Sequence, residues 1–303
     1  MTMRFLSSKL AVWLIAAFLF AASSNAQSRR NARSASLEGT TISITAWRTD
    51  DKTEPIRPDS IFLYENGIEQ KIKSLSYDPS PSRIVLLVDN SKTLPIDLEK
   101  LRAAAMEFAY EIFEGDQLYV VAYDEKPEII NEWTDDAAKM EQSIKNFRKE
   151  GNPHLFDAID VTLRDVLQPL MPGTRKTAIV VIGDGLDRGS KTVFKALLGK
   201  LQEDDVTIYS LQIPDRTGGA YRGGRPKAGA VISQLTEGTG GVAFPVTEAR
   251  EAAKFICEEL RRNRYLLSYV PMNTSSYDFR RVFLVANSGI AVRTKLSQPP
   301  DIK

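Results

Sequence analysis

The chain has 303 residues, of which 43% are hydrophobic, and a formal net charge of +1. This is the composition of a globular protein, and the length allows one large domain and a smaller one. The balanced charge gives no electrostatic reason to expect a nucleic acid partner. A single cysteine, Cys257, excludes an intramolecular disulfide, and its helical surroundings predict a buried packing role. A single histidine, His154, argues against a Ser-His-Asp triad and a typical zinc site.

The first 26 residues are predicted to be a signal peptide. Arg4 and Lys9 precede an unbroken apolar run at residues 10–22, and small residues follow it. The run is shorter than the roughly 17–25 residues that a membrane span requires. The sequence therefore predicts cleavage rather than a retained anchor, and an exported protein, periplasmic or secreted, with no membrane span after cleavage. Residues 27–38 are polar and basic, which is typical of a flexible linker.

Residues 39–82 have the pattern of a small β segment. Residues 41–47 alternate between apolar and polar side chains, as a half-buried strand does. Two further runs, 61–64 and 70–72, flank the Glu65-Asn66-Gly67 turn, and Asn-Gly is a strong hairpin signal.

From Arg83 to residue 263 the pattern becomes that of an α/β domain. Continuous apolar runs predict strands buried on both faces of a parallel sheet. They lie at 84–88, 118–123, 178–182 and 206–213, with shorter strands at 128–133 and 241–245. Helices are predicted between them, at 98–112, 140–147, 155–167, 193–201, 229–237 and 248–262. This alternation predicts a doubly wound, mostly parallel central sheet flanked by helices.

Residues 264–296 return to strands only, predicted at 265–270, 279–286 and 290–296. Because residues 39–82 and 264–296 both lack helical patterns, we expect the two ends of the chain to form one small β unit beside the α/β domain. Residues 297–303 are predicted to be a loose tail.

Two loops of the α/β domain carry the candidate chemistry. In an open α/β sheet, ligands bind outside the carboxyl ends of the strands, near the point where the strand order reverses. Asp89, Ser91 and Thr93 follow the first buried strand at alternate positions, and Asp184 follows the strand at 178–182. Carboxylates and hydroxyls are hard ligands that suit Mg²⁺, Mn²⁺ or Ca²⁺.

These loops resemble those of a known family. RIVLLVDNSKT is similar to the first strand and Asp-x-Ser-x-Ser loop of von Willebrand factor A (VWA) domains, which are Rossmann-like. AIVVIGDGLD resembles their later strand with its Thr-Asp-Gly turn, and GNPHLFDA at 151–158 resembles the Gly-Gly-Thr-Ala-Leu-Tyr-Asp-Ala segment between them. The flanks DSIFLYENGIEQKI and RNRYLLSYVPMNTSSYDFRRVFL resemble those of exported VWFA-related domain proteins common in acidobacteria.

The resemblance implies a metal-ion-dependent adhesion site. In that family a partner's carboxylate completes the coordination of a bound Mg²⁺. Carried over by position, the metal ligands are Asp89, Ser91, Thr93 and Asp184. Two positions depart from the pattern. Thr93 stands where the family has a serine and keeps the hydroxyl, whereas Pro153 stands where the family has a threonine ligand and offers no side-chain oxygen. The sequence therefore allows two interpretations: a site that holds a divalent ion weakly, and a former ion site that no longer binds metal.

Several residues around these loops are candidates for contact with a partner protein. They are Asn152, which could also fill the vacancy at Pro153, together with His154, Asp187, Arg222 and Arg225. Arg216 and Lys227 flank the same Gly-rich segment as the last two, and we interpret that segment as a surface loop able to contact an acidic partner. It lacks the Gly-Lys-Ser/Thr of a phosphate-binding loop. Asp157 is interpreted as a helix-start residue rather than a metal ligand.

Three functions follow from these features. The first is a non-enzymatic, adhesion-type module that binds an acidic residue of an unknown protein partner through the partial ion site. The second is a metal-free structural or interaction protein of the envelope. The third is a metal-dependent phosphoester hydrolase. The sequence disfavours it, because Ser91 stands where an Asp-x-Asp-x-Thr phosphatase has its second acid.

Overall fold

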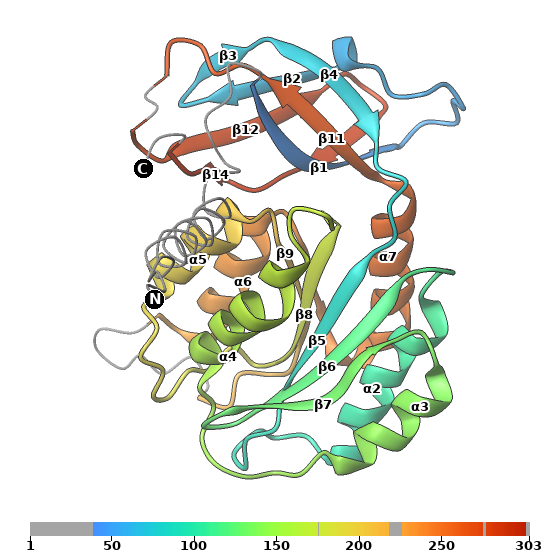
Figure 1. The fold of residues 1–303 in the computed structure, drawn as a ribbon, viewed down its shortest axis with the longest axis vertical. Coiled ribbons are helices and arrows are strands. Elements are labelled where there is room, and N and C mark those ends of the chain that lie inside the picture. Colours follow the sequence, from blue (N-terminus) through green and yellow to red (C-terminus); the bar gives the residue numbers. More distant parts are fainter. Residues whose placement is uncertain (1–38, 175, 218–225, 275–276, 301–303) are drawn as a thin grey trace, which may run out of the picture.

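The computed structural model describes residues 39–174, 176–217, 226–274 and 277–300. The predicted signal peptide and linker lie outside these residues. Figure 1 shows an α/β domain with a smaller β unit at one end of it. None of the helices within the described ranges is both long enough and apolar enough to cross a lipid bilayer.

The α/β domain is built on a six-stranded sheet of order β10-β9-β8-β5-β6-β7. All neighbouring strands are parallel except β7, which pairs antiparallel with β6. The strands are β5 (Arg83–Asp89), β6 (Gln117–Tyr123), β7 (Pro127–Thr134), β8 (Thr177–Gly183), β9 (Thr207–Gln212) and β10 (Ala243–Pro245). The first strand of this domain, β5, lies between β6 and β8, so the strand order reverses beside it. The predicted doubly wound α/β fold is confirmed.

Helices cover both faces of this sheet (Figure 1). One face packs against α2 (Leu98–Glu111), α3 (Ala137–Ser143) and α7 (Ala249–Arg262). The other packs against α4 (Leu155–Val161), α5 (Phe194–Glu203) and α6 (Ala228–Thr239). Alternate residues of β5 enter the two cores, Leu86 on the first face and Leu87 on the second. Burial on both faces explains why the strand is a continuous apolar run.

One predicted helix is wrong in its second half. Residues 155–167 were expected to form a single α-helix, but α4 ends at Val161 and a π-helical segment, Thr162–Leu167, follows. A short 3-10 turn, Gln168–Leu170, then ends the segment. Pro169 lies inside this turn and has no N–H with which to continue an α-helix.

The β unit consists of two four-stranded sheets, of orders β13-β1-β11-β4 and β14-β12-β2-β3, which enclose a shared apolar core. Both sheets mix strands from the two ends of the chain. The N-terminal strands are β1 (Thr40–Arg48), β2 (Ile61–Glu65), β3 (Ile68–Gln70) and β4 (Ile72–Tyr77). The C-terminal strands are β11 (Arg264–Tyr269), β12 (Arg280–Ala286), β13 (Ile290–Arg293) and β14 (Ser297–Gln298).

The hairpin predicted at Asn66 and Gly67 is present between β2 and β3. Both residues have positive φ, 49° and 82°, as a type I′ turn requires. The alternation did not predict β4, which lies at a sheet edge. The tail predicted from residue 297 is wrong for its first two residues, because β14 pairs with Arg280 and Arg281 of β12.

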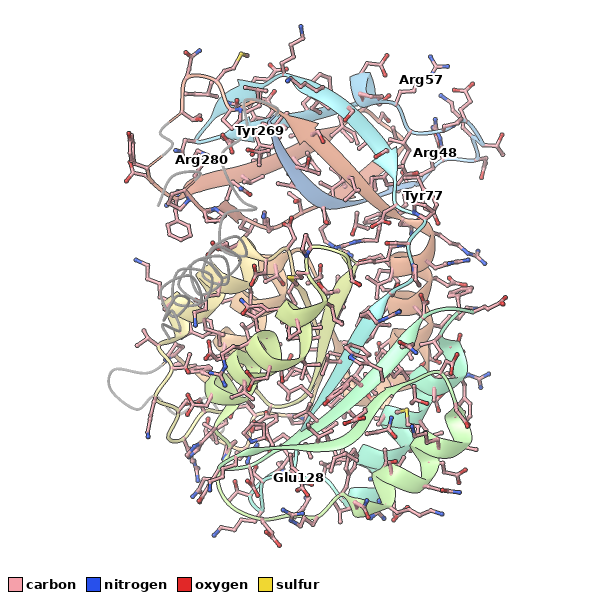
Figure 2. All side chains as sticks on the ribbon, in the orientation of Figure 1. Arg48, Arg57, Tyr77, Glu128, Tyr269 and Arg280 are labelled. Atoms are coloured by element: carbon pink, nitrogen blue, oxygen red, sulfur yellow. The ribbon has the colours of Figure 1, made fainter. Side chains whose placement is uncertain are left out.

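A buried ion pair lies in the core of the β unit. The Glu65 carboxylate accepts hydrogen bonds from Arg280 Nε at 3.0 Å, Tyr269 OH at 2.5 Å and Thr274 Oγ1 at 3.1 Å. Glu65 and Arg280 are both 0% exposed. Figure 2 labels Arg280 and Tyr269 in this unit. Glu65 comes from the N-terminal part of the chain and its partners from the C-terminal part, so the interaction joins the two ends.

We predict that Glu65→Ala destabilises the protein strongly. Removing one member of a buried ion pair costs about 3–5 kcal/mol, and this change takes from Arg280 its buried Glu65 partner. Glu69→Ala is the matched control, because Glu69 is exposed on the neighbouring strand β3, and it should change stability by no more than about 0.5 kcal/mol. Urea unfolding followed by circular dichroism measures both. Similar midpoints for the two variants would contradict the prediction.

Candidate functional site

The carboxyl ends of β5 and β8 place two carboxylates side by side at the end of the sheet remote from the β unit. Asp89 is the last residue of β5, and Asp184 directly follows β8. Both are completely buried, as is Ser91 in the loop after β5. The sequence predicted that these loops would meet, and the structure brings Asp89, Ser91, Thr93 and Asp184 together around one point.

That point is occupied by the side chain of Arg216, which lies in the loop after β9. Its Nε donates to Asp184 Oδ2 at 2.5 Å, and its Nη2 donates to Asp184 Oδ1 at 2.8 Å and to Asp89 Oδ2 at 2.5 Å. Its Nη1 donates to Ser91 Oγ at 2.8 Å and to Thr93 Oγ1 at 2.6 Å. The Arg216 side chain is 5% exposed. The four predicted metal ligands thus surround a cation that belongs to the protein itself.

Backbone hydrogen bonds shape the loop after β5. The Ser91 N–H donates to Asp89 Oδ1 at 2.9 Å, so the Asp89 carboxylate closes a local turn with one oxygen and meets Arg216 with the other. Lys92 N donates to Glu150 O, and Glu150 N donates to Asn90 O. The segment before α4 therefore lies alongside this loop and supports it.

The loop after β8 depends on a glycine. Asp184 Oδ1 accepts from Leu186 N at 3.0 Å across a turn in which Gly185 has φ +82°. A Cβ at Gly185 would lie 2.4 Å from the carbonyl oxygen of Ala228 and 2.7 Å from the Ile232 side chain in α6. The turn can therefore pack closely against the start of α6 only if residue 185 has no side chain.

Burial and charge oppose each other at Asp89. Burial raises the pKa of the Asp89 carboxyl, and the neighbouring positive charge of Arg216 acts in the opposite direction. Asp184 lies close enough to add a smaller upward contribution to the pKa of Asp89. Without a cation, the two buried carboxylates would repel each other in a poorly solvated site. Arg216 supplies that cation.

The segment before α4 contributes no side-chain oxygen to this point. Pro153 is buried, and its carbonyl accepts from Arg188 N at 2.7 Å. Asn152, the predicted substitute, instead donates to Glu125 Oε1 at 3.2 Å. His154 donates its backbone N–H to Asp124 O, and its ring packs against Gly189, where a Cβ would lie 2.3 Å from Nε2.

The other predicted contact residues have local roles or lie elsewhere. Asp187 Oδ1 accepts from Ser190 Oγ at 2.5 Å and from Phe156 N at 3.3 Å, within the loop after β8. Asp157 lies in the first turn of α4, which agrees with the prediction, and its carboxylate accepts from the backbone N–H groups of Lys191 and Thr192. Arg222 and Arg225 lie outside the described residues.

The interpretation of Arg216 as a surface residue facing a partner is wrong. Arg216 adjoins the Gly-rich segment, but its guanidinium points into the protein and binds the domain's own acids. No periodic pattern marks it. The sequence indicates its role only through chemistry. Two neighbouring carboxylates require a positive charge, and Pro153 leaves the segment before α4 without a side-chain ligand for a metal ion.

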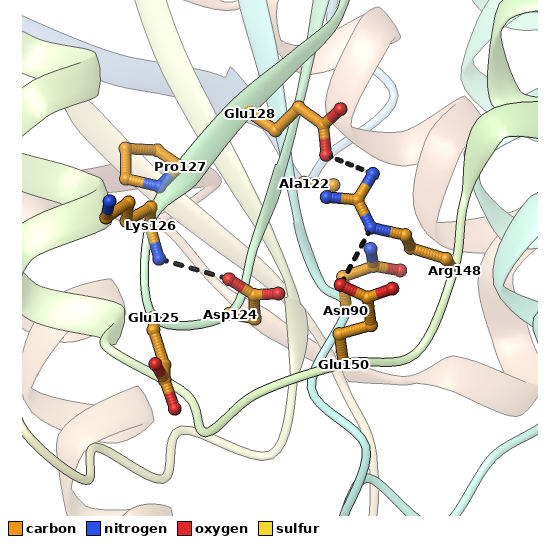
Figure 3. Close-up of a pocket in the computed structure, with 9 residues that line it drawn as sticks. All are labelled: Asn90, Ala122, Asp124, Glu125, Lys126, Pro127, Glu128, Arg148 and Glu150. Carbon is orange, nitrogen blue, oxygen red and sulfur yellow. Dashed lines mark hydrogen bonds and ion pairs between the residues drawn. The ribbon is translucent and has the colours of Figure 1, made fainter.

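Beside the site lies a polar hollow of about 280 Å³ at the ends of β5 and β6 (Figure 3). Its charged lining residues are Asp124, Glu125, Lys126, Glu128, Arg148 and Glu150. Arg148 forms ion pairs with Glu128 at 2.7 Å and Glu150 at 3.2 Å. Asn90 also lines the hollow, so it adjoins the loop that carries Ser91 and Thr93.

The donor set around Arg216 suits a hard cation only in part. Two carboxylates and two hydroxyls are present, but their oxygens already accept the arginine's N–H groups, and Pro153 supplies no further side-chain oxygen. Within the described ranges, no group of three or more His, Cys, Asp and Glu side chains could hold a metal ion. As arranged here, the residues do not fit a divalent ion.

Cys257 has no part in this site. It is 1% exposed in α7, and burial raises the pKa of its thiol. The predicted packing role is confirmed, because the side chain belongs to the core between α7 and the sheet.

The comparison with protein families agrees with the fold of the α/β domain. Residues 84–186, about a third of the chain, match the family described as von Willebrand factor type A domain. No curated protein sequence matches the chain. Among solved structures, a von Willebrand factor type A protein from Catenulispora acidiphila is similar with 10% identity and a TM-score of 0.49, covering 87% of this chain and 75% of that one. An aerotolerance-related membrane protein from Bacteroides fragilis has 17% identity and a TM-score of 0.47, covering 60% and 99%.

The α/β domain of this chain is a von Willebrand factor type A domain. The matched residues run from β5 to the turn after β8, and the doubly wound sheet places the ends of these two strands at one edge. The narrower resemblance of the flanks to exported acidobacterial proteins stays a prediction.

We predict that Gly185→Ala lowers stability by at least about 2 kcal/mol, because left-handed backbone strains an alanine and its Cβ would collide with Ala228. Gly229→Ala, at the start of the adjacent helix α6, is the control. A Cβ there meets only Gln212 Nε2, at 3.9 Å, so alanine should be neutral or stabilise by up to about 1 kcal/mol. Thermal unfolding compares the two variants. Equal melting temperatures would show that the turn does not require glycine.

Proposed function

We propose that this protein is an exported, non-enzymatic binding module that contacts a protein partner through the edge of the sheet where β5 and β8 end. The observation that carries the proposal is the convergence of Asp89, Ser91, Thr93 and Asp184 at this edge of a VWA domain. Ligands of open α/β sheets bind at such a strand-order reversal. The predicted signal peptide at residues 1–26 supports export.

The exposed rim of the site offers the contacts that a partner can use. Asp124, Glu125, Glu128 and Glu150 line the polar hollow, with Lys126 and Arg148 among them. Acids outnumber bases in this set, so the hollow suits basic or hydrogen-bonding groups of a partner better than acidic ones. Charged rims of this kind steer association and determine partner choice more than they add affinity.

A metal-free interaction protein is the form of this function that the geometry favours. In the metal-dependent form, a partner's carboxylate binds the ion directly. Here the central cation is Arg216, and each of its side-chain N–H groups already has an acceptor inside the domain. The guanidinium thus has no donor left for a partner's carboxylate.

The hydrolase alternative gains no support from the site. A phosphoester hydrolase of the Asp-x-Asp-x-Thr kind needs a nucleophilic carboxylate and a second acid beside it. Asp89 Oδ1 accepts from the Ser91 backbone and Asp89 Oδ2 from Arg216, and Ser91 itself provides only a hydroxyl. Neither Asp89 oxygen is directed toward solvent, since the residue is completely buried.

The proposal is tested by capturing proteins from the envelope fraction with native protein and with the double variant Glu125→Lys, Glu150→Lys. Reversing two exposed charges at the rim should reduce capture of a true partner by roughly tenfold, because wrongly paired charges at an interface cost over 1 kcal/mol. Lys73→Glu is the control, because Lys73 is exposed on β4 in the remote β unit.

Capture that Lys73→Glu removes and the rim variant keeps would refute the assignment of the binding face. A parallel arm with chelator separates the two forms of the function. Capture that survives chelation indicates a metal-free contact, and capture that chelation abolishes indicates the metal-dependent form.

A further inference from the structure

We propose that Arg216 is the resident cation of the adhesion site, and that it excludes a divalent ion from that site in the native chain. The proposal concerns what fills the site, and it holds whichever protein binds the face. Measurements of metal binding alone therefore test it separately from the proposed function.

The match between donors and acceptors is complete. A guanidinium has five N–H donors in a planar fork. Five different oxygen atoms accept them: both carboxylate oxygens of Asp184, one of Asp89, and the hydroxyls of Ser91 and Thr93. An octahedral Mg²⁺ would need these oxygens at about 2.0–2.1 Å from its own centre. The same atoms cannot serve the ion while Arg216 lies between them.

The main chain holds Arg216 in this position. The Arg216 N–H donates to Asp184 Oδ2 at 3.3 Å, so the backbone as well as the side chain binds this carboxylate. The neighbouring Asp215 accepts from Thr217 N at 2.7 Å and from Thr217 Oγ1 at 2.6 Å, which closes a turn around Arg216. A side chain that is 5% exposed and anchored on both sides is an integral part of the site.

The departure from the family pattern at Pro153 supports the same conclusion. Pro153 removes the ligand that an octahedral ion would take from the segment before α4. Arginine does not need that ligand, because its fork is already satisfied by the loops after β5 and β8. Because the site lacks the metal ligand at Pro153 and contains the buried guanidinium of Arg216, it suits the guanidinium better than a metal ion.

The charges of the site agree with this assignment. Two buried carboxylates with one guanidinium carry a formal charge of −1, whereas the carboxylates alone carry −2. A divalent ion would have to break the Arg216 ion pairs with Asp89 and Asp184 before it could bind. Breaking a buried ion pair is costly, and this cost is subtracted from any affinity for the ion.

Titration calorimetry with MgCl₂ and MnCl₂ tests the proposal on the native protein and on Arg216→Ala. We expect no saturable binding to the native protein at millimolar ion concentration. Arg216→Ala should bind one ion per chain at least roughly 100-fold more tightly, because the competing cation is gone. Mg²⁺ should also raise the melting temperature of Arg216→Ala and leave that of the native protein unchanged. Lys92→Ala is the matched control, since it removes an exposed cation from the loop after β5 but leaves Arg216 in place.

Some outcomes would overturn the proposal. One is Mn²⁺ bound to the native protein, seen by electron paramagnetic resonance and lost in Asp89→Asn. The other is a folded Arg216→Ala that binds no ion, which would show that Arg216 is not what excludes it. If that variant does not fold, Arg216→Gln replaces it, because glutamine fills more of the space. If both variants fold only when Mg²⁺ is present and the native protein binds no Mn²⁺, the requirement for a cation and its supply by Arg216 are both supported.

Discussion

The contact of one guanidinium with two buried carboxylates is the constraint on which the face of this VWA domain depends. Parallel strands β5 and β8 end at the same edge, so Asp89 and Asp184 are brought together by the fold itself. Neither carboxylate is exposed, and a buried pair of like charges requires compensation. Arg216 supplies it from the loop after β9, the next strand in the sheet. The loops after β5, β8 and β9 are thereby held together at one point.

The sequence predicts this architecture well where burial gives a clear pattern. The apolar runs around Leu86 and Val180 are buried on both faces, so their strands are found within a residue of the expected ends. The Asn66–Gly67 turn is found because its two residues favour positive φ. The pattern fails where burial is partial or the backbone is irregular. Examples are the edge strand β4 and the π-helical segment after Val161, whose side chains follow no simple period.

The acids and hydroxyls of the site were predictable, because their spacing follows directly from the strand ends. The orientation of the Arg216 side chain was not predictable, because a loop without periodicity does not indicate whether a long side chain faces solvent or the core. Two pieces of chemistry in the sequence would have helped. One is the buried acid pair at Asp89 and Asp184, which needs a cation. The other is Pro153, which weakens the case that the cation is a metal. Asn152 offered a false alternative, because its side chain binds Glu125.

Arginine and a metal ion make different binding faces from the same acids. A metal ion can exchange one of its ligands, so a partner's carboxylate can complete its coordination. A guanidinium with every donor satisfied has no such open position, and its occupancy does not vary with the concentration of divalent ions. Arg216 therefore makes the centre of this face a fixed structural element. Under the proposed function, recognition falls to the exposed groups around it, among them Glu125 and Glu150, whose side chains line the hollow beside the loop of Ser91 and Thr93. A partner selected by such a rim responds to ionic strength rather than to chelation.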